Sequence, residues 1–352
     1  MSRIIKVFAV AVACATAASA LSAQAPAAPS SHQPSKTPWG DPDLQGIWPS
    51  TDMVGVPFER PKQFGNRLFL TDAEFKTRQD AAAKQSALDV LEFDLEKPPD
   101  EVVALGDVGG VTSPPPHWLE RGEPSRQSSL IVEPINGQMP AMTPEGLARQ
   151  KGSGGTYTKQ TGWNNASELS AYDRCISRGP VGSMMPVVYN NGNEIVQGPG
   201  FVAFRNEMIH ETRIIPLDPS TSSGSPRAES RGDDRVVSPM FKSYMGYSRG
   251  HFEGNTLVVR TTNLNGRTGM QGNGSMLINS DALVLTERFT PIGKDALQYE
   301  VTINDPRTWT QPWKVSFPLK RESDYGFFEY ACHEGNYAMR NTLSGSRADE
   351  KK

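Results

Sequence analysis

The sequence of 352 residues has only three cysteines and five histidines, and none of them lies in a compact metal-binding or redox motif. There is no HExxH, the pattern of many zinc proteases, and no CxxC, the pattern of zinc ribbons and thioredoxin-like sites. GxSxG, GxGxxG and the P-loop pattern are missing too, which argues against serine hydrolases and nucleotide-binding proteins. We therefore expect no cofactor. A metal site built from His210, His251 and His333 on separate strands is the alternative left open.

Long apolar runs are also absent. Residues 7–18 are apolar, but this stretch is shorter than the roughly 20 residues that span a membrane. It follows a short basic start and precedes two small-x-small triplets, at 18–20 and 23–25, which is typical of a secretory signal peptide. Because Pro26 disfavours cleavage after the second triplet, residues 1–20 are the expected signal peptide. The mature protein is expected to be periplasmic or secreted.

Acidic residues slightly outnumber basic residues. Removal of residues 1–20 takes two of the 36 Lys and Arg and none of the 39 Asp and Glu, so the net charge changes from −3 to −5. No basic stripe suits nucleic acid, and no segment suits stable membrane insertion. The partner that we expect is a small organic molecule. The sequence leaves the oligomeric state open.

Two cysteines, Cys175 and Cys332, remain after the signal peptide. In an oxidising compartment, two cysteines most simply pair with each other. The sequence therefore predicts a disulfide bond that closes a very long loop, with a stabilisation of about 4–5 kcal/mol in the chain-entropy model. A paired Cys332 also argues against a thiol nucleophile beside His333.

The composition favours a turn-rich β protein, because Gly (32) and Pro (28) are abundant and the hydrophobic fraction is only 37%. Two helices are predicted in the first half. One is capped by Thr71 and Glu74 and runs to about Leu91, and the other starts at Thr143. The expected parts are a signal peptide (1–20), a disordered tether (21–37), an irregular wrapping segment with short helices (38–160), an antiparallel β domain (161–345) and a charged tail (346–352).

The second half consists of strand-like runs joined by short turns, such as Gly254-Asn255 and residues 293–295. Successive strands of this kind favour an antiparallel meander, hence a lipocalin-like barrel or a sandwich. Residues 325–333 are predicted to be the last strand, with Cys332 and His333 on opposite faces. The turn at 334–336 would then carry polar groups at the end of the strand.

Six segments together resemble a family of exported bacterial proteins with no established activity. They cover most of the mature chain. Members often have a different basic or polar residue where this chain has His251, which puts a shared role of His251 in doubt. The segments are PDLQGIW (42–48), DRC (173–175), EMIHETRIIPLD (207–218), FEGNTLVV (252–259), DPRTWTQPW (305–313) and YACHEGNY (330–337).

Strand alternation places one carboxylate inside the β domain. Glu287 shares the apolar face of its strand with Leu285 and Phe289, and Tyr299 lies on the inner face of the next strand. A buried carboxylate is costly unless a cation or hydrogen-bond donors satisfy it. Two interpretations follow: Glu287 pairs with an arginine such as Arg213 and braces the domain, or it is a functional group in a cavity.

We hypothesise that these groups serve an exported, cofactor-independent enzyme that performs an elimination, isomerisation or hydrolysis by acid–base chemistry. His210 or His333 would move the proton, Glu287 would be the partner, and Arg213 or Arg249 would hold an anionic group. Convergence of His210 and Arg213 requires a bulge, because they are three residues apart. Trp309 either lines the cavity or plugs the end of the domain. The alternative is a non-catalytic, small-molecule-binding barrel. The predicted substrate-binding residues are Arg213, Arg249, Tyr299, Trp309 and Tyr337.

Overall fold

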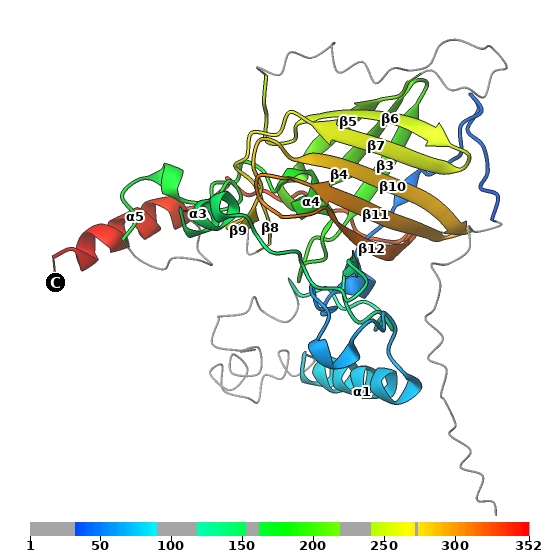
Figure 1. The fold of residues 1–352 in the computed structure, drawn as a ribbon, viewed down its shortest axis with the longest axis horizontal. Helices are drawn as coiled ribbons and strands as arrows, with labels where there is room; N and C mark the ends of the chain where they lie inside the picture. Colours follow the sequence, from blue (N-terminus) through cyan, green and yellow to red (C-terminus); the bar gives the residue numbers. More distant parts are fainter. Residues whose placement is uncertain (1–31, 90–117, 153–161, 219–240, 272–273, 352) are drawn as a thin grey trace, which may run out of the picture.

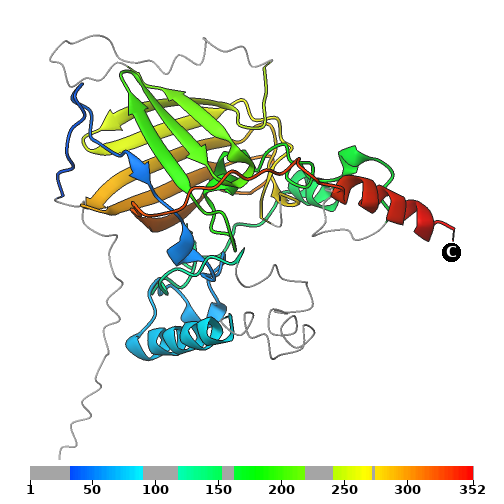
Figure 2. The same cartoon turned by 180° about the vertical axis from the view of Figure 1, so that it is seen from behind.

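The computed structural model describes residues 32–89, 118–152, 162–218, 241–271 and 274–351, and it is mainly antiparallel β structure with few helices. Two sheets lie face to face, with the larger one in front in Figure 1 and the smaller one in front in Figure 2. The expected signal peptide (1–20) and most of the expected tether (21–37) lie outside the described residues.

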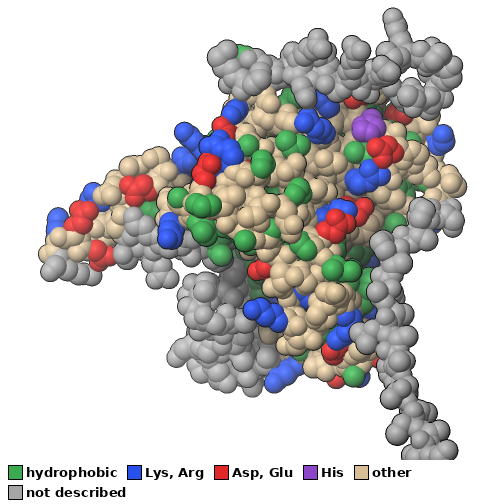
Figure 3. All heavy atoms as spheres, viewed as in Figure 1, with side chains coloured by type: hydrophobic (Ala, Val, Ile, Leu, Met, Phe, Trp, Pro, Cys, Tyr) green, Lys and Arg blue, Asp and Glu red, His purple; other side chains and the backbone are tan. Residues whose placement is uncertain are grey.

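The large sheet has six strands in the order β2-β12-β11-β10-β7-β6, and every neighbouring pair is antiparallel. The predicted turn at Gly254-Asn255 is confirmed, because Glu253 pairs with Thr256 across it. Figure 3 shows charges of both signs, with apolar side chains scattered among them, on the outer face of this sheet. The strands are β2 (Ile131–Glu133), β6 (Tyr247–Glu253), β7 (Thr256–Thr262), β10 (Val284–Gly293), β11 (Ala296–Asn304) and β12 (Trp313–Lys320).

The small sheet has four strands in the order β1-β3-β4-β5, and β8 and β9 form a separate hairpin. The edge strands β1 and β2 come from the segment that we expected to be irregular (38–160), so this segment completes both sheets. The strands are β1 (Gly46–Ile47), β3 (Asn193–Gly198), β4 (Phe201–Asn206), β5 (Thr212–Pro216), β8 (Gly269–Gln271) and β9 (Met276–Ile278).

The two sheets meet at their edges through isolated contacts. Leu217, just after β5, forms a single parallel bridge with Gly250 of β6. On the opposite side, the backbone N–H of Glu322 donates to the carbonyl of Ile47 at 3.1 Å. No continuous ladder joins the sheets in the part of the chain that the structure describes, so a closed barrel is not found.

Aromatic rings fill the space between the sheets. Phe204 of the small sheet packs on Phe289 of the large one, with ring centroids 4.6 Å apart. Tyr299 lies 5.1 Å from Phe289 and 5.3 Å from Phe317, and these three residues have no exposed surface. The predicted inner faces of β10 and β11 are confirmed, including Glu287 at 0% exposure. The centre of the sandwich is a packed core.

The helix starts follow the predicted caps. Thr71 and Glu74 exchange hydrogen bonds ahead of α1 (Asp72–Asp89), and Thr143 accepts from Gly146 in α3 (Pro144–Gly152). Two further helices were not predicted, α4 (Gly179–Met184) and α5 (Ala338–Asp349). In Figure 1, α5 projects from the sheets and contains part of the expected charged tail. Short 3-10 helices span Thr51–Met53, Lys62–Phe64, Ala166–Glu168 and Met208–His210. None of the described helices is long and apolar enough to cross a membrane.

The predicted last strand, 325–333, is wrong. Residues 321–337 form an irregular segment, here called the C-terminal strap, with turns at 323–324 and 332–335. The cause is non-local: β12 pairs with β11 along one side, and β2 pairs with the start of its other side at Lys314 and Val315. The strap therefore crosses the lower end of the small sheet on its way to α5, as Figure 2 shows.

Candidate functional site

Arg213 and Glu287 form an ion pair in the middle of the core. Arg213 Nη1 and Nη2 lie 2.5 and 3.0 Å from the two carboxylate oxygens of Glu287, and their side chains are only 5% and 0% exposed. Tyr299 donates its hydroxyl to the same carboxylate at 3.2 Å. Burial alone would lower the pKa of Arg213, but the charge and hydrogen bonds of Glu287 outweigh it and raise this pKa. Burial, followed by the charge of Glu287, raises the pKa of Tyr299.

This arrangement corresponds to the bracing interpretation. The pair joins β5 of the small sheet to β10 of the large sheet, and all three groups are enclosed by packed apolar side chains. A substrate has no contact with these groups while the core remains packed. Arg213, Glu287 and Tyr299 therefore lie together as predicted, but in a filled interior.

The two histidines of the hypothesis lie elsewhere. His210 is exposed between β4 and β5, and His333 is exposed in the C-terminal strap. The chain kinks at Ile209 and His210, ahead of the stretch where the hypothesis required a bulge, and His210 lies in solvent while Arg213 enters the core. The predicted convergence of all four groups on one cavity does not occur.

The other predicted substrate-binding residues are also separated. Arg249 is ion-paired with Asp218 at the surface. Tyr337 is 65% exposed just before α5. Trp309 is 1% exposed and packs edge-to-face on Trp313 with centroids 5.3 Å apart, which corresponds to the plug interpretation.

The predicted disulfide between Cys175 and Cys332 is confirmed, with Cα atoms 5.7 Å apart. It joins the DRC segment to the C-terminal strap across 157 residues of sequence. Asn336 of the strap donates to the carbonyl of Cys332 at 2.8 Å. The tight grouping of residues 330–337 is thus a covalent anchor for the strap.

Between β4 and β5 the chain forms a kink over residues 207–211, here called the kinked segment. Ile209 and His210 have φ angles of 63° and 46°, which place two side-chain-bearing residues in the left-handed region. Each such residue costs about 1–3 kcal/mol, and such strain is concentrated at functional sites. Met208 and Ile209 are buried and pack against Tyr172, Tyr189 and Tyr330.

The strap is fastened to the kinked segment through Glu207, which is 1% exposed. Its carboxylate accepts from Asn190 Nδ2 (3.0 Å), Gly192 N (3.1 Å), Phe328 N (3.1 Å) and Tyr325 Oη (2.6 Å). The Tyr325 hydroxyl also lies 2.9 Å from Glu120. Burial, then the hydrogen bond to Glu207, raises the pKa of Tyr325, so this phenol remains a donor at neutral pH.

Glu211 occupies the other end of the kinked segment and is partly buried. It accepts from Ser177 Oγ at 2.9 Å and from the backbone N–H of Arg178. Burial raises its pKa, and these two hydrogen bonds and the positive charge of Arg213 only partly oppose this effect. A glutamate of this kind keeps its proton to higher pH than an exposed one.

Arg178 and a group of tyrosines lie beside the kinked segment. Arg178 is 5% exposed, and its guanidinium carbon lies 5.5 Å from the centre of the Tyr172 ring. The hydroxyls of Tyr172 and Tyr330 are 3.1 Å apart. Burial and the neighbouring Tyr189 raise the pKa of Tyr172, which keeps it neutral. A carboxyl, a guanidinium and neutral phenols are suited to proton transfer on a polar organic molecule.

Glu211 and Arg178 were not among the site residues that the sequence predicts. Glu211 stood in a run whose two faces both mix apolar and ionisable residues, and this was its only signal. Arg178 follows the DRC segment in a stretch with no strand or helix periodicity. Three of the six signature segments, around residues 173–175, 207–213 and 330–337, nevertheless meet at this site.

Metal ligands do not gather in the described ranges, where no group of three or more His, Cys, Asp or Glu side chains is arranged to hold an ion. His251 lies on β6 and contacts Glu253 at 3.2 Å on the surface. In comparisons with known proteins, no family model, no curated protein and no solved structure matches the chain.

Proposed function

We propose that the protein is an exported, cofactor-independent enzyme that moves protons on a small organic substrate at the kinked segment. The observation that carries this proposal is the meeting of three distant segments at the kinked segment, whose Glu211 is a partly buried carboxyl with a raised pKa. A general acid or base works best when its pKa approaches the working pH. Glu211 takes the proton-moving role that the sequence suggests for His210 or His333, and Glu287 is enclosed in the core.

In this proposal Glu211 exchanges a proton with the substrate, and the guanidinium of Arg178 offsets the negative charge that develops when a proton leaves carbon. His210, exposed beside Glu211, exchanges protons with solvent. Charge development of this type occurs in isomerisations and eliminations through an enolate, so we favour these over hydrolysis. Strain at Ile209 and His210 fixes the orientation of the acid.

The disulfide supports a periplasmic or secreted location, since such bonds persist in oxidising compartments. We also propose that the two sheets behave as one flattened barrel, supported by the edge contacts at Leu217–Gly250 and Glu322–Ile47. A non-catalytic, small-molecule-binding protein is the second candidate. The neutral ring cluster of Tyr172, Tyr189 and Tyr330 favours it, because phenols stack on and hydrogen-bond to ring-shaped ligands.

Glu211→Gln tests the proposal. We expect it to lower the rate of proton transfer about 10²–10⁴-fold, the usual contribution of a general acid or base. The amide keeps the size of the carboxyl and its hydrogen bond from Ser177, so the melting temperature should change little. The measurement is deuterium incorporation from D₂O next to the carbonyl of small keto acids and ketones, followed by proton NMR.

Glu253→Gln is the matched control, because Glu253 is an exposed glutamate on β6. It should exchange deuterium at the wild-type rate. Equal rates for wild type and Glu211→Gln on a substrate that the wild type turns over would refute the role of Glu211. Saturable binding of these compounds without any exchange would favour the second candidate.

A further inference from the structure

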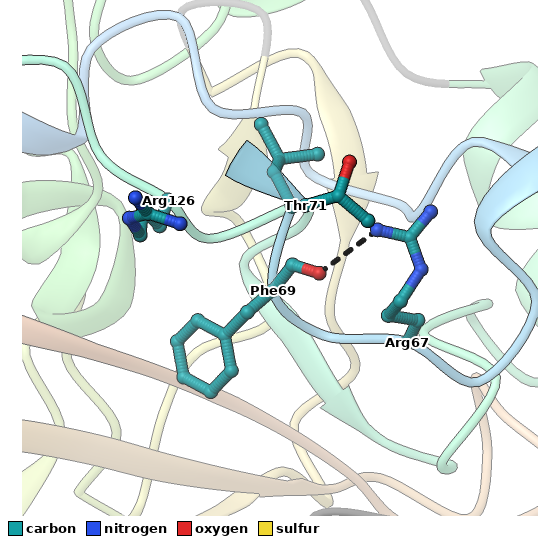
Figure 4. A pocket seen from close by; sticks show the side chains of 5 residues that line it. Arg67, Phe69, Thr71 and Arg126 are labelled. Atoms are coloured by element: carbon teal, nitrogen blue, oxygen red, sulfur yellow. Dashed lines mark hydrogen bonds between the residues drawn. The ribbon is translucent and has the colours of Figure 1, made fainter. Parts of the chain in front are cut away.

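An open pocket of about 500 Å³ lies far from the kinked segment, beside the start of α1. Its volume is within the range of about 300–1,000 Å³ that small-molecule sites occupy. Figure 4 shows Arg67 and Arg126 on opposite sides of Phe69. The pocket is lined by Arg67, Phe69, Leu70, Thr71 and Arg126.

The two arginines differ in how fully they are neutralised. Arg67 gives two hydrogen bonds to Glu74, at 2.6 and 2.8 Å, and one to the carbonyl of Phe69. These bonds hold the Arg67 side chain in one position at the side of the pocket. Among the described residues, the Arg126 guanidinium gives one hydrogen bond, from Nη1 to Asp72 at 2.7 Å, and the Asp72 side chain is 91% exposed. An exposed pair of this kind contributes little and exchanges readily.

Arg126 is nevertheless held in place. Its guanidinium carbon lies 4.4 Å from the centre of the Phe75 ring, and its backbone carbonyl accepts from Leu70 N at 2.9 Å. A guanidinium has five N–H donors in a planar fork, and the part of the chain that the structure describes uses one of them. The remaining donors can bind a carboxylate with two parallel hydrogen bonds.

Phe69 supplies the apolar part of the pocket. Its side chain is 45% exposed, although a large hydrophobic residue gains stability from burial. The backbone of Phe69 forms an antiparallel bridge with Gln127, which fixes the position from which the ring extends. A flat ring that stacks on Phe69 would bring an attached carboxylate toward Arg126.

We propose that this pocket binds a small aromatic carboxylate, with its carboxylate on Arg126 and its ring on Phe69. The pocket shares no residue with the site around Glu211, so the proposed catalysis and this binding stand or fall separately. Asp72 and Glu74 are the acidic groups that contact the two arginines, and a bound carboxylate competes with Asp72.

Titration of the full chain with sodium benzoate tests the proposal, with benzamide as a neutral ligand of the same shape. We expect saturable benzoate binding, followed by calorimetry or amide NMR shifts, and binding of benzamide about tenfold weaker or more, since a charge-assisted pair is lost. Arg126→Gln should weaken benzoate by a similar factor. Asp72→Asn removes the competing carboxylate and should strengthen benzoate binding.

Arg340→Gln, on exposed α5, is the control and should leave benzoate binding unchanged. Equal affinity for benzoate and benzamide would overturn the proposal, as would unchanged benzoate binding in Arg126→Gln and Asp72→Asn. Absence of saturable benzoate binding to the wild-type chain would overturn it as well. Because Asp72→Asn changes affinity in the direction opposite to Arg126→Gln, misfolding cannot produce the expected pattern.

Discussion

Arg213→Met should lower the free energy of unfolding by about 3–5 kcal/mol, because it leaves the carboxylate of Glu287 buried without its cation. Glu287 has no exposed surface, and Tyr299 is the one other donor that the described residues bring to it. Water cannot replace the guanidinium in a core packed with aromatic rings. Urea denaturation followed by tryptophan fluorescence measures the change.

The whole network can be removed together. Arg213→Met combined with Glu287→Leu and Tyr299→Phe replaces the polar groups by apolar ones of similar size, so no buried charge remains. Such replacements are often neutral or stabilising, and we expect the triple variant to recover most of the stability lost by Arg213→Met. A loss below about 1 kcal/mol in the single variant, the value typical of surface pairs, would contradict the bracing role.

Loss of the disulfide should have a comparable effect. Cys175 and Cys332 are 157 residues apart, and in the chain-entropy model a loop of this size gives about 4–5 kcal/mol when it is cross-linked. We expect the double variant Cys175→Ser and Cys332→Ser to unfold at correspondingly lower urea concentration. The strap should also detach more easily from the kinked segment, since the hydrogen bonds of Tyr325 and Phe328 and the packing of Tyr330 then hold it without a covalent link.

Reductant provides the matched comparison. Wild type with dithiothreitol should unfold like the double serine variant, and the variant itself should not respond to dithiothreitol. Two free thiols in the denatured, unreduced wild type, or identical denaturation curves with and without dithiothreitol, would contradict the assignment.

Much of the core could be predicted because strand alternation is a local signal. The alternation of side chains along each strand placed Glu287 and Tyr299 inside the domain. A buried carboxylate requires a cation, and Arg213 is that cation in the structure. The helix caps at Thr71 and Thr143 are equally local. The disulfide followed from the count of cysteines in a chain expected to be exported.

The rest depends on distant parts of the chain. Ile209 and His210 take left-handed conformations that their residue types disfavour, and contacts from distant segments, such as the packing of Ile209 in the tyrosine cluster, accompany them. This kink sends His210 outward and brings Glu211 to Ser177. The strap could not be distinguished from a strand, because the partner that occupies the edge of β12 is β2, about 180 residues earlier in the sequence.

The raised pKa of Glu211 also makes the free energy of unfolding depend on pH. The folded protein binds the proton of Glu211 more tightly than the unfolded chain does. Its contribution to stability is therefore complete below the ordinary glutamate pKa and is lost as the pH rises through the folded pKa. Glu211→Gln removes this dependence, so its stability relative to wild type should increase as the pH rises through that window.

The most direct measurement is the titration of Glu211 itself, by carbon-13 NMR of the side-chain carboxyls in glutamate-labelled protein. The signal that disappears in Glu211→Gln identifies the residue. A midpoint clearly above the ordinary glutamate pKa of about 4.3 is the predicted result, because burial disfavours the charged form. A midpoint at or below that value would show that the pKa of Glu211 is not shifted towards the working pH, and would contradict the pKa tuning on which its acid–base role depends.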